Sequence, residues 1–200
     1  MRKSHLAGIL FLALAVAACE PQDSKPGEAV APPFATADTK TAGCAVHVEK
    51  DWINEENPLR RYTSEAQTLG PICRQAVAVL IIRAREGSPI YTWSGEVKHL
   101  FGLTDAPDAA AMKSALEEWI TQSGMLATTA SLPAWEETEG QPQRAEFPFM
   151  PESWIDRETW DSLRAEELDV FCFPQGSESL RCADLRDGRM EEIGLQLFPG

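Results

Sequence analysis

The sequence predicts an α+β fold with a mainly antiparallel sheet, in which an N-terminal hairpin and a C-terminal three-stranded meander pack with two helices. Three observations support this prediction. A continuous apolar run at 76–82 precedes a turn and a second strand, helical periodicity covers 108–123, and alternating apolar residues with two turn signals cover 168–198. Strands and helices are therefore segregated along the chain, which is typical of α+β domains.

The predicted hairpin runs through QAVAVLIIRAREGSPIYTWS, residues 75–94. Its first strand, Ala76–Ile82, is apolar throughout and contains several β-branched residues, which is typical of a strand covered on both faces. Gly87-Ser88 supplies the turn. With that turn at the centre, the cross-strand pairs would be Ile82 with Trp93 and Ala84 with Tyr91.

Residues 108–123 predict the longer helix. Asp108 is suited to the N-cap, and Gly124 stands where a C′ glycine belongs. Apolar residues recur at helical spacing and would form one core-facing stripe of Met112, Ala115, Leu116, Trp119 and Ile120.

A shorter helix is predicted over 156–167, with Asp156 as its cap and Trp160 and Leu163 facing the core. The stretch between the two helices, 132–153, contains four prolines and reads as a loop. A connection of this length is either an interaction loop or an irregular segment wrapped on the domain.

The charge balance is acidic and limits the classes of partner. The full chain has 18 Lys and Arg against 31 Asp and Glu, a net charge of −13. Removing residues 1–18 takes away Arg2 and Lys3 and no acid, which leaves the remaining chain at −15. Such a chain repels a phosphate polymer, so we expect no nucleic-acid partner.

Residues 1–18 predict an export signal. Arg2 and Lys3 form a positive start, Leu6–Ala18 form an apolar stretch too short to span a bilayer, and small residues stand at the end. Val16-Ala17-Ala18-Cys19 resembles the lipobox of bacterial lipoproteins. That resemblance implies cleavage before Cys19 and acylation of Cys19, which would anchor the chain in a membrane. It covers only the first 20 residues, and the alternative is an ordinary secretory signal with a chance cysteine.

By resemblance to Gram-negative lipoproteins, Glu20 directly after the cysteine favours the outer membrane, facing the periplasm, over inner-membrane retention. Residues 20–43 are rich in Pro, Ala, Thr and acids, so together with Cys19 we interpret 19–43 as the lipidated residue and a flexible tether. As a coil, the tether would span roughly 25–30 Å. Residues 44–200 would then form a single domain.

The cysteine count agrees with a lipid-modified Cys19. Five cysteines are an odd number, and assigning Cys19 to lipid leaves four that can form two disulfides in an oxidising compartment. A first meander turn centred on Ser177 places Cys172 opposite Cys182, which leaves Cys44 to pair with Cys73. The second turn, Asp187-Gly188, predicts one apolar face made of Val170, Cys172, Leu180, Cys182, Ile193 and Leu195, with Cys182 opposite Ile193 and Leu180 opposite Leu195.

Common signatures of catalysis, metal binding or cofactor binding are missing from the sequence, so we expect no cofactor and no metal. His47 and His99 lie on different predicted elements without ligand-spaced partners. Two acidic clusters are interpreted as a turn-associated group and a solvated surface, although the first could offer oxygen ligands to calcium. They are Asp184, Asp187, Glu191 and Glu192, and Glu136, Glu137 and Glu139.

Six tryptophans are many for this length, and three lie in loop-like or element-edge positions: Trp52, Trp135 and Trp154. Such rings stack on sugars, contact protein partners or pack under loops. We therefore hold two hypotheses. The first is a non-catalytic binding or assembly module with an envelope protein or glycan as partner. The second is a periplasmic hydrolase that acts on a cell-wall or glycan substrate through carboxylates.

Overall fold

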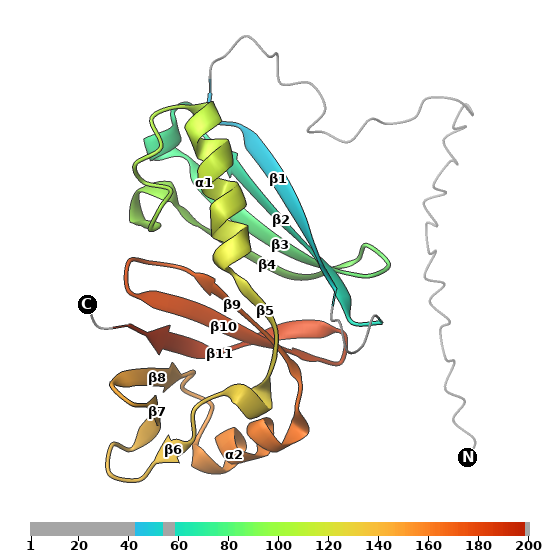
Figure 1. Cartoon of the computed structure of the whole chain (residues 1–200), viewed down its shortest axis with the longest axis vertical. Coiled ribbons are helices and arrows are strands. Elements are labelled where there is room, and N and C mark those ends of the chain that lie inside the picture. Colours follow the sequence, from blue (N-terminus) through green and yellow to red (C-terminus); the bar gives the residue numbers. More distant parts are fainter. Residues whose placement is uncertain (1–42, 54–58, 199–200) are drawn as a thin grey trace, which may run out of the picture. The chain divides into compact units, whose positions relative to one another are not determined.

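The computed structural model describes residues 43–53 and 59–198, with the side chains of 124–127 left aside (Figure 1). The predicted signal peptide, Cys19 and the tether up to residue 42 lie outside the described residues. The part that is described contains two antiparallel sheets and two α-helices, an α+β fold as predicted. No helix in these ranges has the length and apolar character needed to cross a membrane.

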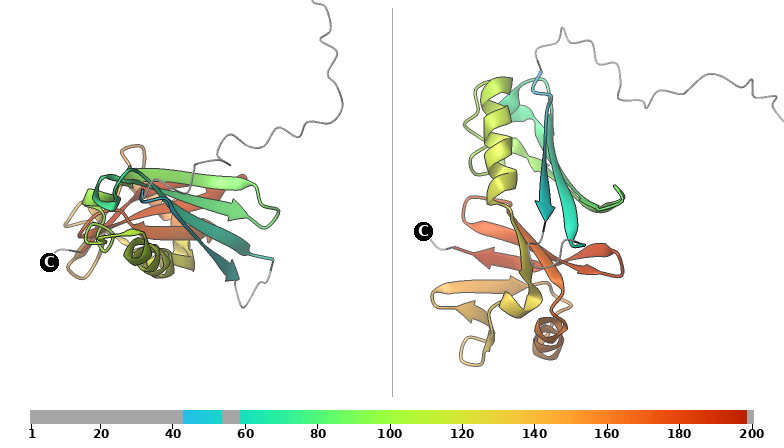
Figure 2. Two further views of the ribbon diagram at one scale, coloured as in Figure 1. Left: turned by 90° about the horizontal axis from the view of Figure 1, so that it is seen from above. Right: turned by 45° about the vertical axis from the view of Figure 1, so that its right-hand side comes forward.

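The first sheet is a four-stranded meander in the order β1-β2-β3-β4. Its strands and the two flanking 3₁₀ turns are β1 (Val46–Ile53), β2 (Arg61–Leu69), η1 (Cys73–Gln75), β3 (Val77–Ala84), β4 (Pro89–Glu96) and η2 (Val97–His99). One face of this sheet is buried, because alternate residues of β2 and β3 are inaccessible to solvent. Figure 2 shows α1 (Ala109–Gln122) running alongside β1.

The second sheet has seven strands in the order β5-β9-β10-β11-β8-β7-β6. Its elements are β5 (Gly124–Thr128), η3 (Thr129–Ser131), β6 (Trp135–Glu136), β7 (Gln141–Arg144), β8 (Phe147–Pro151), α2 (Arg157–Glu166), β9 (Asp169–Pro174), β10 (Ser179–Arg186) and β11 (Arg189–Leu197). The predicted C-terminal meander is β9-β10-β11, and it forms the centre of this sheet.

The central meander has a hydrophobic core on each face, because successive residues of a strand point to opposite sides. Phe171 and Phe173 of β9 pack with buried residues of the first sheet and α1. The residue before Phe171, Val170, points to the opposite side and packs with Trp160 and Leu163 of α2. Only the second of these faces is predicted by the alternation in the sequence.

Both helices begin at the predicted caps. The Asp108 carboxylate accepts a hydrogen bond from Ala111 N at 2.9 Å, and the Asp156 carboxylate accepts one from Thr159 N at 2.9 Å. The predicted stripe of α1 is buried except for Ala115, which is partly buried. The glycine cap was wrong: Gly124 begins β5, and the Ser123 hydroxyl closes α1 by donating to Trp119 O at 2.7 Å.

The first hairpin has a different register from the predicted one. Ile82 pairs with Tyr91 and Leu80 with Trp93, since the turn is longer and Gly87 adopts a φ of 90° beside a bulge at Ile82/Arg83. Coverage of β3 on both faces was also wrong. Ala78, Leu80 and Ile82 are buried, whereas the alternate residues of β3 are exposed or half-buried.

A second bulge changes the predicted register of β10 and β11. Near the Asp187-Gly188 turn the pairing is as predicted, but beyond Cys182/Ala183 it shifts by one residue, so Cys182 faces Gly194 and Leu180 faces Gln196. Leu195 therefore pairs with Arg181 and leaves the predicted apolar face. Gly194 permits this bulge, because its φ is 141° and a Cβ there would overlap the Met150 carbonyl oxygen.

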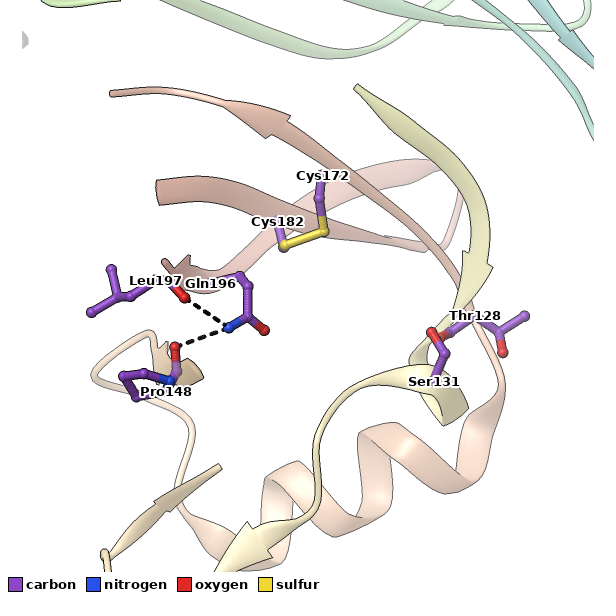
Figure 3. The surroundings of a disulfide bond; sticks show 7 residues. All are labelled: Thr128, Ser131, Pro148, Cys172, Cys182, Gln196 and Leu197. Carbon is purple, nitrogen blue, oxygen red and sulfur yellow. Dashed lines mark hydrogen bonds between the residues drawn. A yellow bond between two sulfur atoms is a disulfide. The ribbon is translucent and has the colours of Figure 1, made fainter. Parts of the chain in front are cut away.

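The stretch predicted as a loop, 132–153, contains three strands, of which β8 pairs with β11. Side chains of α2 hold the segment: the buried Trp160 donates from Nε1 to Pro133 O at 2.9 Å, and the half-buried Arg164 donates from Nε to Leu132 O at 3.1 Å. The Gln196 amide also donates to Pro148 O at 3.1 Å and so joins β8 to the last strand (Figure 3).

The structure forms both predicted disulfides. Cys172 and Cys182 occupy directly opposed positions of β9 and β10 (Figure 3), and Cys44 pairs with Cys73 of η1. Two such bonds are typical of proteins that reside in an oxidising, extracytoplasmic environment.

Candidate binding surface

The three tryptophans proposed from the sequence lie on separate elements, and no ring contact joins any two of them in the described ranges. Trp52 is half-buried in β1, where its Nε1 donates to Ser64 Oγ at 3.0 Å and Lys50 Nζ lies 4.3 Å from the ring centroid. Trp135 is half-buried and packs against the core beside α2. These two rings therefore have structural roles.

Trp154 differs from the other two, since it is 50% exposed. It stands two residues before the N-cap of α2, between β8 and that helix. The Arg186 guanidinium carbon lies 5.6 Å from the centroid of its ring, within the range of a cation–π contact. Arg186 is the last residue of β10, so two segments distant in sequence meet at this ring.

A buried carboxylate fixes Arg186 in place. Arg186 Nε and Nη2 donate to the two Asp184 carboxylate oxygens at 3.2 and 2.8 Å, and Asp184 is fully inaccessible to solvent. Burial raises the pKa of Asp184, and the hydrogen bonds from Arg186 counteract part of that increase. The same hydrogen bonds raise the pKa of Arg186, which therefore stays charged. The buried Asp184 therefore holds Arg186 in place, and Arg186 in turn contacts the exposed Trp154 ring.

An open recess adjoins this series. Arg186 lines it together with residues from the first turns and one face of α2, namely Asp156, Glu158, Thr159, Ser162, Leu163 and Glu166. Glu158, Ser162 and Glu166 are four residues apart in sequence, so they share one face of the helix. The recess therefore combines carboxylates, hydroxyls and one guanidinium, and the arginine that carries this guanidinium also contacts the exposed Trp154 ring.

Two tyrosine–carboxylate–arginine contacts join the sheets. Tyr62 OH of β2 donates to Asp169 Oδ2 of β9 at 2.5 Å, and Arg60 Nη1 lies 3.0 Å from the other oxygen. Burial raises the pKa of Tyr62, and the hydrogen bond to Asp169 raises it further.

The second of these contacts is built in the same way. Tyr91 OH of β4 donates to Glu192 Oε1 of β11 at 2.9 Å, and Arg181 pairs with the other oxygen of Glu192. Burial, and then the contact with Glu192, raises the pKa of Tyr91 as well. Each of the six side chains makes at least one polar contact, although the buried Asp169 Oδ1 and Arg181 Nε have no hydrogen-bond partner in the described part of the chain. The contacts indicate a structural role in fixing one sheet against the other.

The two contacts predict unequal losses of stability. We expect Tyr62→Phe to lower the free energy of unfolding by about 2 kcal/mol, because the Asp169 carboxylate, 5% exposed, loses a donor that water cannot replace. Tyr91→Phe should have a smaller effect, about 1 kcal/mol, because Glu192 is 35% exposed. Urea unfolding followed by circular dichroism measures both, and equal losses for the two variants would contradict this assignment.

Several of the other candidates from the sequence lie in charged pairs. His47 lies 3.4 Å from Glu49 and His99 lies 3.6 Å from Glu96, all on exposed side chains. The acidic cluster near the last turn is divided, because Arg186 binds Asp184 whereas Arg181 binds Glu192. In the acidic cluster of β6 and its turn, Glu137 pairs with Arg157 at 2.9 Å. Across the residues described, no three His, Cys, Asp or Glu side chains are grouped as metal ligands.

The sequence suggests Trp154 as a candidate surface ring but does not indicate its contact with Arg186 or the pairing of Arg186 with Asp184. A signal was available, since residues two apart on a strand share a face and the strand ends at a recognisable Asp187-Gly188 turn. The contact from that strand end to the segment before α2 depends on tertiary structure and has no local signature.

Comparison with protein-family models, curated proteins and solved structures finds no match to this chain.

Proposed function

We propose that this chain is a lipid-anchored cell-envelope protein whose 44–200 domain is a non-catalytic binding or assembly module. Acyl chains on Cys19 would hold it in the outer membrane, facing the periplasm. The lipobox-like Val16–Cys19 supports the anchor. So does the pairing of the other four cysteines, which leaves Cys19 as the odd thiol of the chain.

The observation that carries the binding role is the exposed Trp154 ring held by Arg186 and the buried Asp184. A large aromatic surface left in water and a carboxylate taken out of water both work against folding stability. Together they give a rigid, amphipathic ring at the surface, which is the type of residue that dominates binding energy at interfaces. Function accounts for this arrangement better than stability does.

A periplasmic hydrolase acting on a cell-wall or glycan substrate is the second candidate, and one observation favours it. Asp184 is buried beside the recess with a raised pKa, as a general acid would be. Both of its oxygens, however, accept hydrogen bonds from Arg186, which favours the ionised form over a proton donor. We therefore rank this candidate second.

Site-specific photocrosslinking in the native envelope tests the binding role. A photoreactive residue at Ser162, which lines the recess, should form a discrete adduct in the full-length lipidated chain. The matched position is Thr92, exposed on the outer face of β4. The same adducts from both positions, or none from Ser162 together with turnover of a cell-wall substrate by the purified chain, would reverse our ranking.

A further inference from the structure

We propose that Trp154, Arg186 and the α2 side of the recess bind an uncharged saccharide, with the sugar ring stacked on the indole. This inference rests on the proposed binding function and specifies its ligand class. Three features of the described residues support it: an aromatic platform held by Arg186, the hydrogen-bonding groups of the recess that Arg186 lines, and the charge of that recess.

The platform is held in position from beneath. Arg186 contacts the Trp154 ring and is itself held by two hydrogen bonds to a carboxylate that water does not reach. Little side-chain freedom is therefore lost when a ligand binds, which favours affinity. A sugar ring has a flat face of C–H groups that can stack on an exposed indole. A charged or strongly hydrated group is a poorer partner for the indole, because it would lose its water on stacking.

The recess supplies the polar half of the site. Glu158 and Glu166 offer carboxylate oxygens, which accept hydrogen bonds from sugar hydroxyls, and Ser162 both donates and accepts. Arg186 uses Nε and Nη2 for Asp184, and its guanidinium carries a further nitrogen that can donate to a sugar oxygen. The recess itself is mainly polar, so the apolar contact that a small-ligand site needs comes from the exposed Trp154 ring.

Charge selects among saccharides and against other ligands. Asp156, Glu158 and Glu166 line the recess, whereas the charge of Arg186 is balanced by Asp184. These three carboxylates would repel an anionic glycan. A basic peptide is the competing ligand, and it would bind chiefly through charge. Its affinity would therefore fall steeply with salt, while stacking and neutral hydrogen bonds are only weakly screened.

Calorimetric titration of the full-length chain with chitohexaose and with cellohexaose provides the test. We expect at least one of these uncharged β-1,4-linked oligosaccharides to bind, with an affinity that changes less than about twofold between low and physiological salt. Trp154→Ala should weaken binding by about tenfold or more, and Trp154→Phe, which keeps a ring, should weaken it less. Arg186→Lys should also weaken binding, because lysine cannot make the two parallel hydrogen bonds to Asp184.

Trp52→Ala is the matched control, since Trp52 also carries a cation over its ring but is half-buried in the first sheet. Its binding should equal that of the unaltered chain. Absence of binding to both oligosaccharides, equal affinity of Trp154→Ala, or salt-sensitive binding of a polylysine peptide in their place would overturn the saccharide assignment. An adduct from Ser162 in the envelope could still form with a protein, so this failure is distinct from failure of the proposed function.

Discussion

Trp160→Ala should lower the free energy of unfolding by about 4 kcal/mol, the effect expected for removing a fully buried tryptophan. Trp160 is inaccessible to solvent and packs on Phe149, with ring centroids 4.8 Å apart. Its Nε1 also donates to Pro133 O, so the variant loses a hydrogen bond that holds the segment before β6. Urea unfolding monitored by circular dichroism gives the change.

Trp154→Ala provides the matched control, because it removes the same side chain from a half-exposed position. We expect this variant to lose less than about 1 kcal/mol. Trp160→Phe separates the two contributions, since it keeps a ring in the core but leaves Pro133 O without its indole donor. If Trp160→Ala and Trp154→Ala lowered the free energy of unfolding by similar amounts, α2 would not form a hydrophobic core with the second sheet.

Replacing Cys44 and Cys73 by serine should lower the free energy of unfolding by about 3.6 kcal/mol in the chain-entropy account. This disulfide joins residues 29 apart and links the chain entering β1 to the turn between β2 and β3. The corresponding change at Cys172 and Cys182, only 10 apart, should cost about 2.8 kcal/mol, because a shorter loop is closed.

Guanidinium unfolding of the two double variants under non-reducing conditions checks these values. The unaltered chain in reductant serves as the reference for loss of both bonds, and its loss should exceed that of either variant. Unfolding midpoints unchanged from the unaltered chain would show that the four cysteines do not constrain the domain.

The elements that could be predicted carry local signals. Asp108 and Asp156 mark the starts of both helices through caps that depend on only a few neighbouring residues. The Cys172–Cys182 pairing follows from a short turn and period-2 alternation. In each case, the information needed lies within about 15 residues of sequence.

The elements that were missed depend on contacts distant in the sequence. β2 presents Ser64 and Thr68 to the interior, so it lacks an apolar alternation, and the Ser64 hydroxyl accepts a hydrogen bond from the Trp52 indole of the neighbouring strand. β8 reads as a proline-containing loop, yet it pairs with β11 nearly fifty residues away. The bulge at Gly194 lies where β8 packs closely against β11. Rules for hairpin turns cannot predict it, because they consider only the two strands that the turn joins.

Mass spectrometry of the mature protein, taken from the native envelope and alkylated before reduction, tests the central claim most directly. We predict an N-terminal peptide that begins at Cys19 and carries acyl chains, with Cys44, Cys73, Cys172 and Cys182 protected from alkylation by their disulfides. A mature chain with an unmodified Cys19, or alkylation of any of the other four before reduction, would contradict the account.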